Sequence, residues 1–176
     1  MDYLYVFWVF TGQENKAIKE IKSTFRDNEI VHLQMLVETF FRKQGKVKKE
    51  TKIAFPGYVF ILSEISNDEF IIRSRETIRK SNHVLKLLRY GNSCEAALRK
   101  EERMAIERLW QSEDCIAAST GIIAGDKVIV TDGPFKGRES VIKEIHPRRR
   151  QAIVEINFMG EIRSMAVGLE IVEKLP

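Results

Sequence analysis

The segment from Tyr3 to Phe10 limits the possible folds most, because all eight of its residues are apolar or aromatic. Eight residues are too few to span a bilayer, which takes about 18 or more, and too few for an independent helix, so they predict a β-strand. Its odd-numbered and even-numbered side chains are equally apolar, and such a strand has to be covered on both faces. We expect helices on one face and, on the other, either a partner protein or another part of this chain.

Strand-like and helix-like patterns alternate through the first 110 residues. Apolar residues at helical spacing predict helices, and short apolar runs bounded by turn residues predict strands. The expected order is β-α-β-β-α-β-α, which is a ferredoxin-like α/β sandwich with one additional helix, within the α+β class. The strands are expected at 3–10, 30–41, 58–62 and 84–88, and the helices at 17–25, 67–80 and 97–110. For 30–41 a helix is the alternative, since Leu33, Leu36 and Val37 would also suit one.

The rest of the chain has a different character, with only short strand patterns and Gly-containing turns. Five such strands within residues 122–176 predict a small SH3-like β-barrel. Residues 111–121 are small and polar without periodicity, and we interpret them as a linker between domains 1–110 and 122–176. The five strands are expected at 127–130, 140–145, 151–158, 162–167 and 170–172.

The composition indicates a folded protein without a catalytic or metal-binding pattern. Hydrophobic residues make up 44% and charged residues 31% of the chain, a normal globular balance. Cys94 and Cys115 lack metal-ligand spacing, and with no secretory signal or membrane span they favour a cytoplasmic location. Residues 133–137 lack the phosphate-loop pattern, and the carboxylates of the 97–110 helix, Glu102 among them, resemble surface ion pairs. We expect no enzyme activity, no cofactor, no metal and a monomer.

Positive charge is concentrated in two places, although the net charge is only +4. Residues 42–52 carry six basic side chains and one acid, which predicts either a solvated hairpin or loop, or a nucleic-acid contact through Lys46, Lys48 and Lys49. Residues 148–150 are three consecutive arginines. The planar guanidinium fork suits phosphate, so the arginines are candidates for nucleic-acid binding.

The chain also contains the stretch YVFWVFTGQE at 5–14, FPGYVF at 55–60 and GDKV at 125–128, the last followed by DGPFKG at 132–137. These stretches resemble, in the same order, the opening strand, a second strand and the KOW motif of the NusG family of transcription elongation factors. The resemblance covers almost the whole chain. It implies an NGN-type ferredoxin-like domain followed by a KOW barrel.

The resemblance further implies that the first domain binds the clamp helices of RNA polymerase and promotes processive elongation. The docking face of the family is built from the first strand and the FPGY strand, which gives Trp8, Phe55, Tyr58 and Phe60 in this sequence. The doubly apolar first strand independently indicates an uncovered aromatic face at the same place. The hairpin or loop at 42–52 would then approach the DNA of the transcription bubble.

Two departures from the general family pattern make the chain resemble a specialised paralogue of the LoaP type. Leu4 stands where general members have Trp, and the turn at 147–150 is unusually basic. The resemblance implies that the KOW domain binds an RNA hairpin in a nascent leader transcript. The RNA-binding residues expected from this are Lys136, Arg138, Lys143, His146, Arg148, Arg149, Arg150 and Arg163.

Two alternative functions remain open from the sequence. The chain could be a KOW-type RNA-binding or ribosome-associated protein that never binds polymerase, although this would leave the aromatic face unexplained. It could also be an elongation factor whose barrel recruits a protein, either a ribosomal protein or Rho.

Overall fold

The structure is a computed structural model that describes residues 2–26, 28–109 and 115–175. Contacts between residues divide the chain into two compact units. The first consists of residues 1–34, 55–104 and 158–161, and the second of residues 35–54, 105–157 and 162–176. Compared with the expected domains 1–110 and 122–176, residues 35–54 group with the second unit, and four residues near position 160 group with the first. No helix in the described part of the chain is long and apolar enough to cross a membrane.

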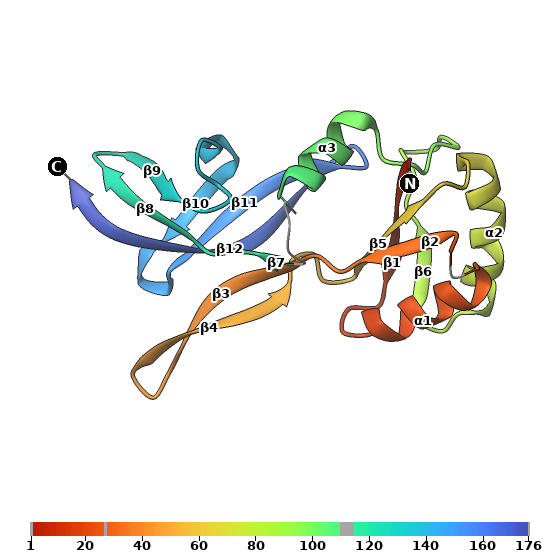
Figure 1. Ribbon diagram of the computed structural model, residues 1–176, viewed down its shortest axis with the longest axis horizontal. Helices are drawn as coiled ribbons and strands as arrows, with labels where there is room; N and C mark the ends of the chain where they lie inside the picture. The colour runs from red at the N-terminus through yellow and green to blue at the C-terminus, as the bar shows by residue number, and fades with distance from the viewer. Residues whose placement is uncertain (1, 27, 110–114, 176) are drawn as a thin grey trace. The chain divides into compact units, whose positions relative to one another are not determined.

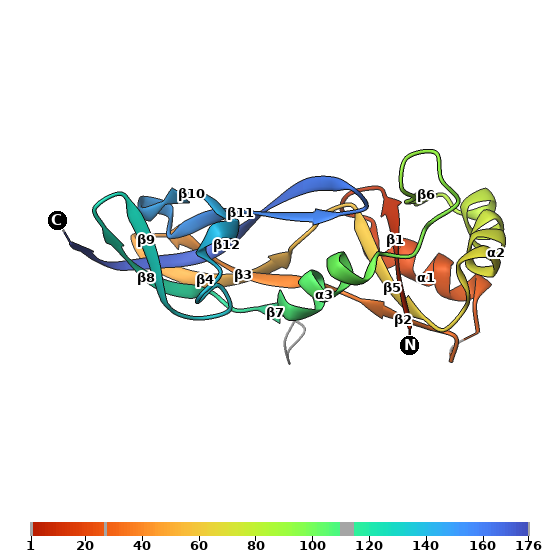
Figure 2. The ribbon, with the colours of Figure 1, turned by 90° about the horizontal axis from the view of Figure 1, so that it is seen from above.

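The first unit is built on a four-stranded antiparallel sheet with the order β2-β5-β1-β6. Strand β1 lies inside the sheet and pairs with β5 from Tyr3 opposite Ser63 to Trp8 opposite Tyr58. Two helices lie on the same side of this sheet in both views (Figures 1 and 2). The elements are β1 (Tyr3–Val9), α1 (Glu14–Thr24), β2 (Ile30–Leu33), β5 (Tyr58–Ser63), α2 (Asn67–Lys80) and β6 (Val84–Leu87).

The helix-covered face of the sheet forms the core of the first unit. Tyr5 and Phe7 of β1 are fully buried there together with Phe70 of α2. The ring of Phe70 stacks on Tyr5 at 3.7 Å between centroids and on Phe25 at 5.0 Å. The helical spacing of apolar residues therefore places α1 and α2 on the sheet as the sequence predicted, and the expected α+β class and α/β sandwich are confirmed.

The second unit contains a five-stranded sheet with the order β10-β11-β12-β8-β9 and a three-stranded sheet with the order β4-β3-β7. Its apolar interior includes Val130, Phe135, Val154 and Val167, all buried. Helix α3 (Lys100–Leu109) begins in the first unit and ends in the second. The strands are β3 (Leu36–Lys43), β4 (Lys46–Ile53), β7 (Cys115–Ile116), β8 (Ser119–Ala124), β9 (Lys127–Asp132), β10 (Ile142–His146), β11 (Gln151–Phe158) and β12 (Glu161–Leu175), with short 3₁₀ turns η1 (Glu139–Val141) and η2 (Pro147–Arg149).

Two strand predictions need correction, and part of the expected linker forms strands. The single strand expected at 30–41 is two strands, β2 and β3, and β3 continues through the basic stretch into β4 as a hairpin that turns at Gln44 and Gly45, both with positive φ. The two strands expected at 162–167 and 170–172 are one strand, β12. The expected linker 111–121 contains β7 and the beginning of β8, and its residues 111–114 lie outside the described residues.

A buried glycine explains why β12 is continuous. A Cβ at Gly168 would lie 2.8 Å from both the Ala118 Cβ and the Glu38 carbonyl oxygen. Glycine at this position therefore allows other chain segments to approach the strand closely, which is one of the roles of glycine inside strands. The strand continues through this position, where the sequence predicts a gap between two strands.

Candidate functional site

The face of the first sheet opposite the helices carries the aromatic residues expected to bind polymerase. Phe60 of β5 pairs with Val6 of β1, and Tyr58 pairs with Trp8, so these side chains share one face of the sheet. Phe55 precedes β5, and its ring lies 5.9 Å from that of Phe60. Three of the four predicted docking residues, Phe55, Tyr58 and Phe60, thus form one aromatic cluster.

The turn between Phe55 and Tyr58 is held by a buried carboxylate. Glu14 of α1 is 6% exposed and accepts a hydrogen bond of 2.9 Å from the Gly57 amide. Gly57 has a φ of +84°, and a Cβ there would lie 2.9 Å from the Thr11 Oγ1 atom. Both the left-handed backbone and the close approach require glycine. The FPGY stretch is therefore a rigid turn that fixes where Phe55 and Tyr58 point.

A residue far away in the sequence covers this cluster. Phe158, which belongs to the first unit, is fully buried and packs edge-on against the rings of Phe55, Tyr58 and Phe60 at centroid distances of 5.3, 5.8 and 5.6 Å. Phe55 and Phe60 are consequently only 4% and 2% exposed. The expected outward-facing aromatic surface is therefore largely covered by the chain itself in this structure.

The residues after Phe158 are fixed by Glu102, which the sequence suggests to be part of a surface ion pair. Its carboxylate accepts hydrogen bonds of 3.1 Å from the amides of Met159 and Gly160, and a further one from the hydroxyl of Tyr90. Met159 and Gly160 have φ values of +57° and +71°, as in the tight primed turns of hairpins. Burial, followed by the hydrogen bond to Glu102, raises the pKa of Tyr90. Glu102 therefore anchors the turn, a role that no local sequence pattern indicates.

Trp8 is the most exposed of the predicted docking residues, whereas Tyr58 is half-buried. Its side chain is 41% exposed, and the Nζ atom of Lys86 lies 5.0 Å from the ring centroid. Phe10, next but one along the chain, is 51% exposed. An exposed Trp near a second exposed aromatic is a strong candidate for an anchor in a protein interface.

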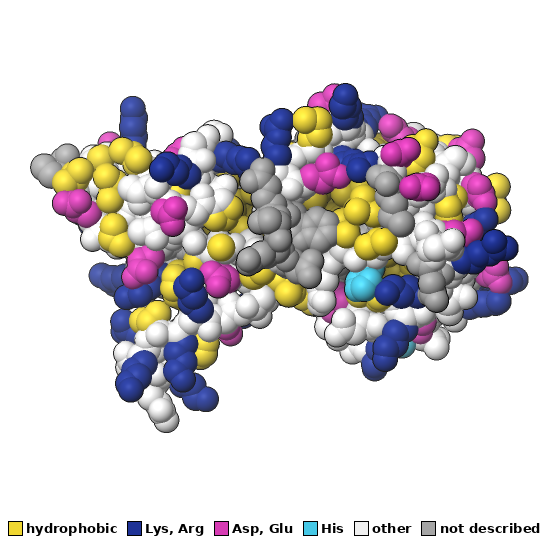
Figure 3. Space-filling view, in the orientation of Figure 1, with side chains coloured by type: hydrophobic (Ala, Val, Ile, Leu, Met, Phe, Trp, Pro, Cys, Tyr) yellow, Lys and Arg dark blue, Asp and Glu magenta, His cyan; other side chains and the backbone are white. Residues whose placement is uncertain are grey.

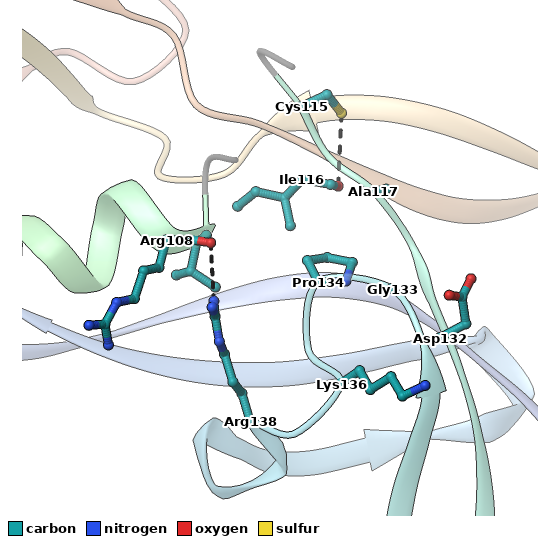
Figure 4. A pocket seen from close by; sticks show the side chains of 10 residues that line it. Arg108, Cys115, Ile116, Ala117, Asp132, Gly133, Pro134, Lys136 and Arg138 are labelled. Atoms are coloured by element: carbon teal, nitrogen blue, oxygen red, sulfur yellow. Dashed lines mark hydrogen bonds between the residues drawn. The ribbon is translucent and has the colours of Figure 1, made fainter. Parts of the chain in front are cut away.

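Two of the predicted RNA-binding residues, Lys136 and Arg138, line a cavity of about 480 Å³ in the second unit together with Arg108. Figure 4 shows Arg138 extended toward the backbone of Arg108, where its Nη1 donates a hydrogen bond of 3.1 Å to the carbonyl oxygen. The side chain of Arg108 points away from this contact (Figure 4).

Three others, His146, Arg148 and Arg149, line a separate cavity of about 410 Å³, which we call the η2 cavity. Ile145, Pro147 and Lys174 complete its lining. Five of the eight expected residues are therefore divided between two cavities with no lining residue in common. Lys143 is exposed on β10, and Arg163 is half-buried on β12.

Arg150 differs from its two neighbours. Its backbone is left-handed, with a φ of +52°, and its guanidinium forms a 2.7 Å ion pair with Glu170. The guanidinium carbon also lies 5.9 Å from the ring centroid of Phe40. Arg150 thus has partners within the second unit, whereas Arg148 and Arg149 are exposed. The three consecutive arginines of the sequence are not equivalent.

The lysines expected to approach DNA lie on the hairpin of β3 and β4, where Figure 3 shows dark blue side chains over the protruding end. Lys46 and Lys48 are exposed and make no ion pair with any described residue. Lys49 instead forms a 3.0 Å ion pair with Glu38. Lys46 and Lys48 therefore fit a contact with an anionic partner better than Lys49.

Glu38 predicts how the stability of the second unit depends on pH. The amide of Ala118 donates a 2.9 Å hydrogen bond to its carboxylate, and together with Lys49 this lowers the pKa of Glu38 below the ordinary 4.5. A lowered folded-state pKa contributes stability that is present above the unfolded-state pKa and is lost as the pH falls through the folded-state pKa. We expect Glu38→Gln to cost about 1 kcal/mol at neutral pH and to lose less stability on acidification than the wild type. Urea unfolding at about pH 7 and about pH 3 measures this difference, and equal losses in both proteins would contradict it.

The chain is similar to known proteins over almost its whole length. The family model described as "Transcription termination factor nusG" matches residues 2–107, and the model of the KOW motif matches residues 124–157. Proteins described as "Transcription termination/antitermination protein NusG" are similar to this chain over most of their length. The protein from Staphylococcus carnosus is 23% identical, and the match covers 97% of this chain and 94% of the relative. The protein from Thermus thermophilus is 26% identical, and the match covers 89% of each chain. A solved structure described as "Domain interaction in Thermotoga maritima NusG" matches with a TM-score of 0.48 and 21% identity, covering 96% of this chain and 93% of that one.

Proposed function

This chain belongs to the NusG family of transcription termination and antitermination factors, and from that premise we propose that it binds the clamp helices of RNA polymerase and promotes processive elongation. The observation that carries the proposal is the aromatic face of the first sheet, where Trp8 is exposed beside the cluster of Phe55, Tyr58 and Phe60. Large aromatic side chains that remain accessible on a rigid sheet are typical anchors of protein interfaces.

Phe158 sets a condition on this docking. A partner helix can reach Trp8 directly, but it can contact Phe55 and Phe60 only after Phe158 has left the cluster, because both rings are buried beneath it. The accessible Trp8 is therefore the first point of attachment in the proposed complex.

Co-purification tests the proposal against the alternative of an RNA-binding or ribosome-associated protein. We expect the tagged full chain to retain RNA polymerase from a bacterial lysate treated with nuclease. Retention of ribosomal proteins without polymerase would contradict the docking proposal and support the alternative.

We also propose that the second unit binds an RNA hairpin, as expected for a specialised paralogue of the LoaP type. Nine Lys and Arg minus eight Asp and Glu leave residues 122–176 with a net charge of only +1. The segment 122–176 by itself therefore has little long-range attraction for polyanions, so its affinity for RNA has to come from local groups such as Arg148 and Arg149. Recruitment of a ribosomal protein or Rho through the same unit is the second candidate.

The double variant Arg148→Ala/Arg149→Ala tests this assignment. Removing one cation from a phosphate should lower the slope of log affinity against log salt by about 0.7–0.9, so for two arginines we expect a reduction of up to about 1.8 with structured leader RNA. Arg150→Ala is a poor substitute because it also breaks the ion pair with Glu170. An unchanged slope and affinity in fluorescence anisotropy would favour the protein-recruiting alternative.

For the β3–β4 hairpin we propose a contact with the DNA of the transcription bubble through Lys46 and Lys48. Charge reversal of both residues should weaken binding to a polymerase elongation complex and reduce its salt dependence. The matched control is charge reversal of Lys16 and Lys19, two exposed lysines of α1 in the first unit that form no ion pair with a described residue; it should leave the salt slope unchanged. If reversal at Lys46 and Lys48 leaves the salt dependence unchanged, the hairpin is only a solvated surface.

A further inference from the structure

The η2 cavity is lined partly by apolar and ring side chains, which a site for phosphate alone does not require. It lies between the turn that follows β10 and the end of β12, and Ile145, His146 and Pro147 contribute apolar or flat ring surface to it. Its volume of about 410 Å³ falls within the range of about 300–1,000 Å³ that is typical of small-molecule sites. The cavity is therefore large enough for a planar group as well as a phosphate.

The cavity also has positive charge available for a ligand. Arg148, Arg149 and Lys174 are exposed, and none of them forms an ion pair with the residues that the structure describes. The neighbouring carboxylate of Glu144 lies 3.3 Å from the Nε2 atom of His146, with which it pairs when the imidazole is protonated. Three cationic side chains thus remain free to bind an anion at an opening whose lining is partly apolar.

We propose that the η2 cavity binds one unpaired nucleotide of RNA, with the base against Ile145, His146 and Pro147 and the phosphates at Arg148, Arg149 and Lys174. This proposal rests on the RNA-binding part of the proposed function and specifies its ligand. Paired bases are stacked inside a helix and cannot enter a cavity, whereas bases of loops and bulges can be splayed out and stacked on His or Arg. Lys174, which the sequence did not indicate, becomes part of the binding site.

The test compares two RNA probes that share one stem. The first is a hairpin with a loop of randomised sequence, and the second is the blunt duplex of the same stem. Because stacking of one base contributes about 1–3 kcal/mol, we expect the full chain to bind the hairpin about tenfold or more tightly than the duplex. Polyglutamate is added as a competitor, and we expect it to displace the hairpin poorly.

Two variants separate recognition of the base from recognition of charge. His146→Ala should bring the ratio of hairpin affinity to duplex affinity close to one while leaving the salt slope nearly unchanged. Lys174→Met should lower the salt slope by about 0.7–0.9 while preserving the preference. Lys16→Met on α1 removes the same charge from an exposed site in the first unit and should change neither quantity.

Each outcome decides between the proposals. Equal affinity of the wild type for both probes would overturn the proposal that the η2 cavity binds a nucleotide. The proposal that the second unit binds RNA would still stand. Failure to bind either probe would overturn both. Efficient displacement of the hairpin by polyglutamate would show that the cavity recognises only charge, and a hairpin preference unchanged by His146→Ala would place the base elsewhere.

Discussion

Replacing Phe158 with alanine is expected to lower the free energy of unfolding of the first unit by about 3 kcal/mol or more. The side chain is fully buried and touches three aromatic rings, so its removal forfeits both the transfer free energy of the ring and its edge-on packing. The neighbouring Glu102 fixes the backbone of Met159 and Gly160, which limits how far the structure can relax into the space left behind.

Urea denaturation measures this effect, with Phe10→Ala as the matched control. Phe10 is 51% exposed, so its truncation should change stability by less than about 0.5 kcal/mol. The same Phe158→Ala protein should bind polymerase more tightly than the wild type, because Phe55 and Phe60 no longer have to be uncovered. Wild-type stability in Phe158→Ala would show that Phe158 does not pack on the cluster in solution.

Replacing Trp8 with alanine is expected to weaken binding to RNA polymerase by about thirtyfold or more. Truncation of an aromatic anchor at the centre of an interface typically costs about 2 kcal/mol or more, which corresponds to that factor. Trp8 is already exposed, so the variant should remain folded and the weaker binding should reflect the interface alone. Ile72→Ala is the matched control, since Ile72 is a large apolar residue of α2 that is 63% exposed.

Much of the first unit could be predicted from sequence because its signals are local. The apolar run of β1, the helical spacing in α1 and α2 and the FPGY stretch each depend on neighbouring residues, and the structure confirms β1, α1, α2 and β5 to within a few residues. The sequence also predicts that the second face of β1 needs a cover, and in the structure Phe158 covers the aromatic cluster on that face. Which residue provides that cover depends on packing across nearly 100 positions between Phe60 and Phe158, which no periodicity encodes.

The second unit was harder to predict because its glycines and charges have more than one physical role. Gly168 permits close packing instead of ending a strand. Arg150 adopts a left-handed backbone and pairs with Glu170, so adjacency to Arg148 and Arg149 did not imply a common function. Likewise, Lys49 pairs with Glu38, a residue eleven positions away on the paired strand. Pairing partners distant in sequence decide which charges remain available.

We propose that this chain binds the clamp helices of RNA polymerase through the aromatic face of its first unit. Titration of the full chain with the isolated clamp-helix coiled coil, followed by calorimetry, measures this interaction without other partners. We expect saturable binding that Trp8→Ala weakens by about thirtyfold and that Ile72→Ala leaves unchanged. Absence of binding by both the wild type and Phe158→Ala, or equal affinity of the wild type and Trp8→Ala, would contradict it.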